Sequence, residues 1–155
     1  MKKKITILSI ISFFIIVIDR VVKILVTKNI PYGKTIDVIK KLFYITNVHN
    51  EGAAFSIMYG LRYILIGLSI AFLILLIYYM YKKKKYNIEF ALIIGGLIGN
   101  LIDRIVFGYV IDYIGVIIYK YYFPIFNIAD ALIVIGAIIF IFRKDGDKNE
   151  ISSKW

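Results

Sequence analysis

The sequence predicts an α-helical membrane protein with four transmembrane helices and a small extracytoplasmic β-sheet after the first helix. Hydrophobic residues make up 61% of the 155 residues, and the mean hydropathy is +0.82. Both values are far above those of a typical soluble domain. Four apolar segments are long enough to cross a hydrocarbon core, which needs about 20 helical residues. The cations are grouped near segment ends, as expected for a protein oriented in a membrane.

The first apolar segment is expected to be retained as a helix. It follows "MKKK" and could be mistaken for a secretory signal, but its apolar stretch exceeds the ~7–15 residues of a signal core. No small-x-small cleavage site follows it. The four helices are expected near residues 5–26, 63–81, 88–106 and 126–142.

The lysine clusters predict the orientation of these helices. If the four segments alternate, "MKKK", the lysines at 82–85 and "RK" at 143–144 fall on one side. The positive-inside rule assigns that side to the cytoplasm, so both termini are expected there. Residues 1–142 would then form a single membrane domain, followed by a polar cytoplasmic tail at 143–155. The first external loop also carries cations, although they are less tightly grouped.

Two segments are expected outside the membrane. The longer, roughly 27–62, shows period-two alternation and β-branched residues between positions 36 and 44. Turn residues at 31–33 and 50–52 bound this stretch, so it predicts short strands in a small sheet on the outer membrane face. The shorter segment, roughly 107–125, is rich in tyrosine and is expected to connect the third and fourth helices.

The composition excludes several kinds of site. The chain has no cysteine, which rules out disulfides, thiolate nucleophiles and cysteine-ligated metals. His49 is its single histidine, which argues against a histidine zinc site or a Ser-His-Asp triad. The net charge is +10, but no basic and aromatic recognition module for nucleic acid is present. We therefore expect no metal, no cofactor and no nucleic-acid partner.

The ten acidic residues can be sorted by their sequence neighbours. Five are expected to be ordinary solvated charges, because they lie in the tail or close to lysines. Glu89, for example, begins the third helix four residues after Lys85. The five are Asp37, Glu89, Asp145, Asp147 and Glu150.

Asp19 and Lys23 are spaced i, i+4 in the first helix, with Arg20 between them. A charge inside a membrane helix costs roughly 3 kcal/mol even on a lenient insertion scale, so the two are expected to pair. We interpret them as a helix-end ion pair in which the lysine can snorkel toward the external interface. A direct catalytic role is less favoured.

The stretch "GGLIGNLIDR" combines polar and small residues. Asn100, Asp103 and Arg104 fall on one helical face, while Gly95 and Gly99 form a small-xxx-small surface for close helix packing. A buried polar network that links helices is favoured here over direct chemistry.

Asp112, Asp130 and Glu51 remain. Neither aspartate has a lysine or arginine within four positions, and both are expected at the external membrane boundary. Asn127 is a suitable helix N-cap with Asp130 three residues later, so Asp130 taken alone is better explained as part of a capping box. If the two aspartates met at a dry interface, one would keep its proton, and the pair could activate water against an amide. The sequence permits this meeting but does not establish it.

Five sequence blocks together resemble the lipoprotein signal peptidases (signal peptidase II). The blocks appear in the order of that family, and the likeness runs from about Asp19 to Gly136. "GNLIDR" and "FNIAD" are specific signatures, whereas "GAAF" alone would be weak. The blocks are "DRVVK" (19–23), "NEGAAF" (50–55), "GGLIGNLIDR" (95–104), "GYVIDYI" (108–114) and "FNIAD" (126–130).

The resemblance implies an aspartyl endopeptidase of the bacterial cytoplasmic membrane with its active site near the extracytoplasmic face. Its substrate would be a prolipoprotein whose cysteine bears a diacylglyceryl group, cut on the amino side of that cysteine. The loop after the first helix would form a β-sheet cradle, and a short helix there would cover the site. Membrane lipid is an expected partner, globomycin an expected inhibitor, and the enzyme an expected monomer.

Carried over residue by residue, the resemblance implies a catalytic dyad of Asp112 and Asp130. Eight further residues would bind substrate or support the site: Asp19, Lys23, Asn50, Gly52, Asn100, Asp103, Arg104 and Asn127. Glu51, Ala131 and Arg20 depart from the common family pattern, which puts substrate preference rather than activity in doubt.

Other functions are also considered. A proton or cation pathway would use Asp19, Asp103, Arg104 and Asp130 as a polar route, although these acids cluster toward one end of the helices. A helix-packing scaffold would use the glycine faces and need no dyad. A serine-lysine protease is disfavoured because Ser56 has no obvious lysine base.

Overall fold

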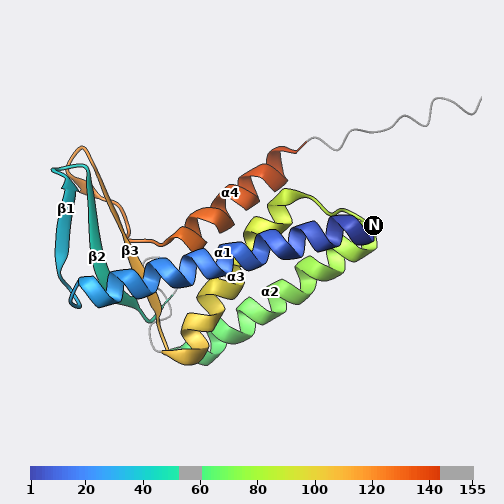
Figure 1. The fold of residues 1–155 in the computed structure, drawn as a ribbon, viewed down its shortest axis with the longest axis horizontal. Helices are drawn as coiled ribbons and strands as arrows, with labels where there is room; N and C mark the ends of the chain where they lie inside the picture. The colour runs from blue at the N-terminus through green and yellow to red at the C-terminus, as the bar shows by residue number, and fades with distance from the viewer. Residues whose placement is uncertain (53–60, 144–155) are drawn as a thin grey trace, which may run out of the picture.

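The computed structural model describes residues 1–52 and 61–143. Within these residues the chain forms four helices and a four-stranded antiparallel sheet (Figure 1). The sheet lies at one end of the helices, and the N-terminus lies at the other. Residues 53–60, which include the end of "NEGAAF" and Ser56, lie outside the described residues, as does all of the expected tail except its first residue.

Each helix overlaps one of the apolar segments identified in the sequence. α1 and α2 are long and apolar enough to cross a membrane. α3 has 19 residues and carries Glu89, Asp103 and Arg104, and α4 is shorter at 15 residues. That all four cross the bilayer stays a prediction. The bounds are Lys2–Asn29 for α1, Arg62–Lys83 for α2, Ile88–Val106 for α3 and Ile128–Phe142 for α4.

The sheet draws on both segments outside the helices. β1 (Thr35–Ile39) and β2 (Phe43–Asn50) form the hairpin that the alternating pattern predicts. The segment at 107–125 connects α3 to α4 as expected, but it also contributes two strands that were not predicted. β3 (Val110–Ile118) and β4 (Tyr121–Tyr122) extend the sheet in the order β1-β2-β3-β4. β3 is rich in β-branched residues, which favour a strand once a neighbouring strand offers hydrogen bonds. Its pairing with β2 sets Asp112 opposite Val48.

Arg62 joins the start of α2 to the end of α3. Its Nε donates to the Arg104 carbonyl at 2.8 Å, and a terminal nitrogen donates to the Ile105 carbonyl at 2.7 Å. These carbonyls belong to the last turn of α3, where helix geometry supplies few partners. Gly108 follows with φ of +92° and packs against the Arg62 guanidinium. This junction fixes the path of the chain from α3 into β3.

Glycines on α3 allow α1 and α4 to approach it closely. A Cβ at Gly99 would lie 2.8 Å from Asp19 Oδ2, and a Cβ at Gly96 would lie 2.5 Å from the Ala129 carbonyl oxygen. Small residues let membrane helices come into backbone contact in this way. They bring the polar residues of α1 and the first turn of α4 against α3.

Gly96→Ala is expected to destabilise the protein by about 1–3 kcal/mol, because the added methyl group would push the backbone of α4 away from α3. The matched control is Gly67→Ala in α2, where nothing lies within 4 Å of the added Cβ. The control should be neutral or slightly stabilising, since alanine is the better helix former. Thermal unfolding of the purified variants in detergent measures both changes. Equal midpoints for the two variants would contradict this account of helix packing.

Glu89 differs from its expectation as a solvated charge. Its side chain is only 1% exposed, and it forms an ion pair with Arg143 at 3.0 Å. Arg143 follows α4, far from Glu89 in sequence, so local spacing could not reveal this partner. The pair joins the start of α3 to the end of α4.

Candidate active site

The two aspartates that the sequence left without neighbouring cations lie where the helices meet the sheet. Asp112 is on β3, and Asp130 is in the first turn of α4. Asp112 is 2% exposed, and Asn127, which caps α4, is fully buried. Asp130 is half-buried. The antiparallel pairing of β3 with β2 and the docking of α4 on α3 bring these side chains to one place.

Asn127 contacts both carboxyl groups. Its side-chain oxygen accepts from the Asp130 N–H at 2.8 Å, and Asp130 Oδ2 accepts from the Asn127 N–H at 3.3 Å, which is the predicted capping box. Its side-chain nitrogen donates to Asp112 Oδ1 at 2.6 Å. The two interpretations of Asp130, as a cap and as one of a pair, are therefore compatible.

Two other asparagines complete the hydrogen bonding of the pair. Asn50, at the end of β2, donates to Asp112 Oδ2 at 2.8 Å. Asn100, on α3, donates to Asp130 Oδ1 at 2.7 Å, while its own oxygen accepts from Asn127 at 3.2 Å. Three asparagine side chains from three different elements thus hold the two carboxyl groups in fixed positions.

The surroundings of Asp112 favour its protonated form. Burial raises the pKa of Asp112 to about 7, and the neighbouring Asp130 carboxylate adds to the increase. The hydrogen bonds from Asn50 and Asn127 act in the opposite direction. Near neutral pH, the Asp112 carboxyl is therefore divided between its protonated and ionised forms.

A buried ion cluster supports the site from α1. Lys23 Nζ lies 2.7 Å from Asp19 Oδ2 and 2.8 Å from Asp103 Oδ2, and it donates to Asn100 Oδ1 at 3.0 Å. Arg20 also pairs with Asp103. The Asn100 that accepts from Lys23 is the residue that donates to Asp130, so the cluster is linked to the pair by hydrogen bonds.

The expectation that Lys23 snorkels toward the interface is wrong. Its side chain is 0% exposed and points into the bundle. Burying an ammonium group is costly unless it is well paired, and two carboxylates and an amide oxygen surround this one. The predicted i, i+4 pair of Lys23 with Asp19 is present. Spacing within α1 could not reveal the two further partners of Lys23, which lie on α3.

Arg104 and Gly52 organise the chain beside Asn50. An Arg104 side-chain nitrogen donates to the Gly52 carbonyl at 3.2 Å, and the Gly52 N–H donates to Asn50 Oδ1 at 3.0 Å. Asn50 is thereby oriented to present its nitrogen to Asp112.

Tyr113 was not singled out from the sequence, yet its buried hydroxyl accepts from the Ile128 N–H at 3.3 Å. Tyrosine is too common in this chain for the sequence to have distinguished it.

The three departures from the family pattern lie in different surroundings. Arg20 has a structural partner in Asp103, and its guanidinium lies 5.4 Å from the centre of the Phe107 ring. Glu51 is exposed, next to Gly52. Ala131 is half-buried in the first turn of α4 and places no hydroxyl beside Asp130.

Comparisons with known proteins give one consistent result. The family model described as Signal peptidase (SPase) II matches residues 11–144. A lipoprotein signal peptidase of Halothermothrix orenii is 42% identical over 135 residues, which is 85% of this chain and 90% of that protein.

Two solved structures of bacterial membrane enzymes, determined by the in meso method, are also similar. The one at 2.3 Å resolution has a TM-score of 0.84 and 35% identity, over 97% of this chain and 96% of its own. The one at 1.9 Å resolution has a TM-score of 0.80 and 35% identity, over 88% of this chain and 91% of its own.

The matched region contains both aspartates, the three asparagines and the ion cluster. The match to a peptidase family confirms the resemblance seen in the sequence blocks and sets aside the ion pathway and the scaffold. The chain belongs to the signal peptidase II family, the bacterial membrane peptidases that remove the signal peptides of lipoprotein precursors.

Proposed function

We propose that Asp112 and Asp130 are the catalytic dyad of this peptidase. The observation that carries the proposal is the contact of Asn127 with both carboxyl groups, through its side-chain nitrogen to Asp112 and its backbone N–H to Asp130. Two acids held together in a largely buried site favour sharing a proton over ionising together. One ionised and one protonated carboxyl group is the arrangement that water-mediated amide cleavage requires.

The hydrogen bonds suggest a role for each aspartate. Asp130 accepts from Asn100 and from a backbone N–H, and it lies in the first turn of α4, where the helix dipole favours a negative charge, so we assign it the role of general base. Asp112, with its raised pKa of about 7, is the protonated partner. Asp130 takes a proton from water, the resulting hydroxide attacks the scissile carbonyl, and Asp112 stabilises the tetrahedral oxygen. As the C–N bond breaks, the leaving amine takes from Asp130 the proton that came from water, which returns Asp130 to its ionised form.

The proposed substrate is a prolipoprotein whose cysteine carries a diacylglyceryl group, cut on the amino side of that cysteine. It enters laterally from the bilayer with its acyl chains in the hydrocarbon, which fixes the depth of the scissile bond. Binding energy from the acyl chains would thus contribute to positioning the amide between the two aspartates. The enzyme acts as a monomer without metal or organic cofactor, and globomycin inhibits it by occupying the substrate position.

The proposed topology places four transmembrane helices in the bacterial cytoplasmic membrane as one domain, residues 1–142. The arrangement of the chain supports it, because the lysines at 2–4 and 82–84 lie at the helix ends away from the sheet (Figure 1). Both termini would be cytoplasmic, and the sheet and the dyad would lie near the extracytoplasmic face, with the sheet acting as the cradle.

The direct test of substrate class uses purified protein and two forms of one precursor. A diacylglyceryl-modified prolipoprotein should be cut immediately before the modified cysteine, as read by mass spectrometry of the products. The same precursor without the lipid should be cut far more slowly, and globomycin should block cleavage of the modified form. Equal cleavage of both forms would contradict the proposed substrate class.

The pH dependence should report which aspartate carries the proton. If Asp112 must be protonated, its active form is lost as pH rises through about 7, so kcat/KM should fall about tenfold for each pH unit above that value. Thermal unfolding over the same range shows whether the protein remains folded. A rate that rises through pH 7 would instead assign the base role to Asp112.

A further inference from the structure

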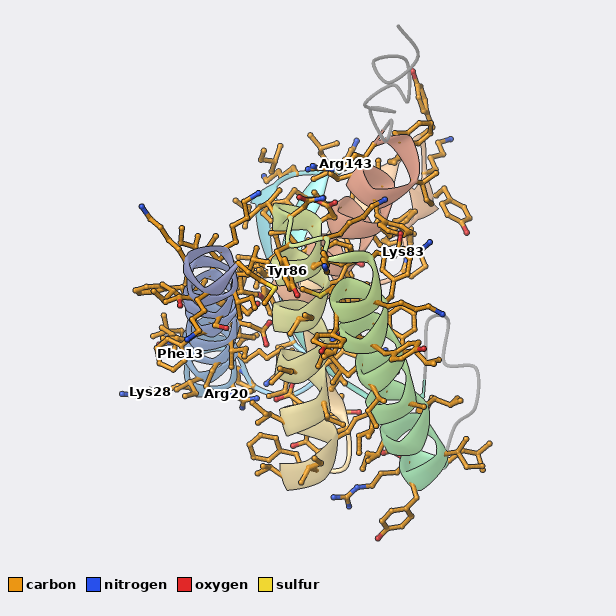
Figure 2. The ribbon with its side chains drawn as sticks, turned by 90° about the vertical axis from the view of Figure 1, so that its right-hand side faces the viewer. Phe13, Arg20, Lys28, Lys83, Tyr86 and Arg143 are labelled. Carbon is orange, nitrogen blue, oxygen red and sulfur yellow. The ribbon has the colours of Figure 1, made fainter. Side chains whose placement is uncertain are left out.

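An apolar groove unrelated to the dyad lies at the opposite end of the helices. It has a volume of about 450 Å³, lies between α1 and α2, and has α3 as its floor. Figure 2 shows α1 and α2 standing apart, with Tyr86 between them. The lining includes Ile5, Ser9 and Phe13 from α1, Met80 from α2, and Tyr86 and Ile98 from the α3 side.

The depth of the groove matches one leaflet of a bilayer. Along α1 its lining runs from Ile5 to Ile16, which at 1.5 Å per residue is about 16 Å. The hydrocarbon core of a bilayer is about 30 Å thick, so the groove spans roughly half of it. A lipid acyl chain of the adjacent leaflet has the length and the apolar character that such a groove accommodates.

Exposed lysines lie at the end of the groove that is farthest from the sheet. Lys2 begins α1 one helical turn before the groove-lining Ile5, and Lys84 directly follows the last residue of α2, four positions after the groove-lining Met80. Both lysines are exposed. Among residues 1–52 and 61–143, Glu89 is the acid at this end, and it pairs with Arg143. Lysines at the end of a membrane helix attract anionic lipid headgroups.

We propose that an anionic phospholipid occupies this groove, with one acyl chain between α1 and α2 and its phosphate group at Lys2 and Lys84. The match of groove depth to one leaflet and the cations at the mouth carry the proposal together. The proposed orientation of the helices makes this the cytoplasmic leaflet. The binding itself depends neither on that orientation nor on the catalytic dyad.

The test is a competition measured by native mass spectrometry. Full-length protein in mixed micelles with equimolar dioleoyl phosphatidylglycerol and dioleoyl phosphatidylcholine should retain one phosphatidylglycerol in clear excess. Ser9→Trp, which fills the groove from an exposed lining position, should reduce retention at least fivefold. The matched control is Thr6→Trp, at an exposed position of the same helix that does not line the groove, and it should retain lipid as the wild type does.

A second pair of variants tests the charge. Lys2→Gln with Lys84→Gln should abolish the preference for phosphatidylglycerol, whereas Lys3→Gln with Lys82→Gln, of equal charge at the same end, should preserve it. Equal retention of the two lipids by the wild type would overturn the proposal, as would equal losses from Ser9→Trp and Thr6→Trp. If the wild type were a dimer and Ser9→Trp dissociated it, the groove would instead bind a second copy of the chain, and the proposal would be wrong.

Discussion

Replacing either Asp112 or Asp130 by asparagine should reduce prolipoprotein cleavage by about 10²–10⁴-fold, the range expected for loss of a positioned acid or base. Asparagine keeps the shape of the side chain but can neither accept the proton of water nor supply a carboxylic acid proton. The double variant should be no slower than the slower single variant, because the two groups act in one step. Product formation from a diacylated precursor measures all three rates.

The control for this prediction is Asp37→Asn, the same change at an exposed aspartate on β1. It should cleave at the wild-type rate. Circular dichroism and thermal unfolding should show that the Asp112 and Asp130 variants keep their helix content, since asparagine has nearly the same shape and volume as aspartate. Wild-type turnover in either of those two variants would refute the dyad.

The second large effect is expected at Lys23. Lys23→Met should destabilise the protein by about 3–5 kcal/mol, because it leaves the carboxylate of Asp19 buried without its ammonium partner. It also removes one of the two donors to Asn100 Oδ1, and Asn100 in turn holds Asp130, so activity should fall as well. Thermal unfolding and the cleavage assay measure the two effects separately.

Two further variants separate charge from position. Lys28→Met, on an exposed part of α1, should change neither stability nor activity appreciably. Asp19→Leu combined with Lys23→Met removes both charges and should recover part of the lost stability, because a buried pair can often be replaced by apolar side chains. It should not recover activity, since Asn100 still lacks the hydrogen bond from Lys23. Full stability of Lys23→Met alone would contradict the role given to this cluster.

Hydropathy and the local pattern of charges were enough to predict much of this molecule. The apolar segments predicted where the helices lie, and alternation near Ile36 predicted the β1–β2 hairpin. The absence of nearby cations separated Asp112 and Asp130 from every other acid except Glu51, and the spacing of Asn127 and Asp130 predicted the capping box. Each of these features depends on residues that are close together in the chain, so a single sequence is enough to recognise it.

Contacts between distant segments do not follow from local patterns in the sequence. β3 becomes a strand because β2 supplies its partner, and the short apolar run around Asp112 does not specify that partner. Lys23 turns inward because Asp103 and Asn100 lie on a different helix. The meeting of Asp112 with Asp130 likewise depends on the fold, and the family resemblance implied it before the geometry was known.

Infrared difference spectroscopy of purified enzyme with isotope-labelled aspartate tests the central claim most directly. If the dyad holds one proton at neutral pH, the wild type should show the carbonyl band of a protonated aspartic acid that disappears as pH rises through about 7. The band should be lost in Asp112→Asn and kept in Asp37→Asn. An Asp112→Asn spectrum identical to that of the wild type would mean that Asp112 carries no such proton, and the proposed mechanism would be wrong.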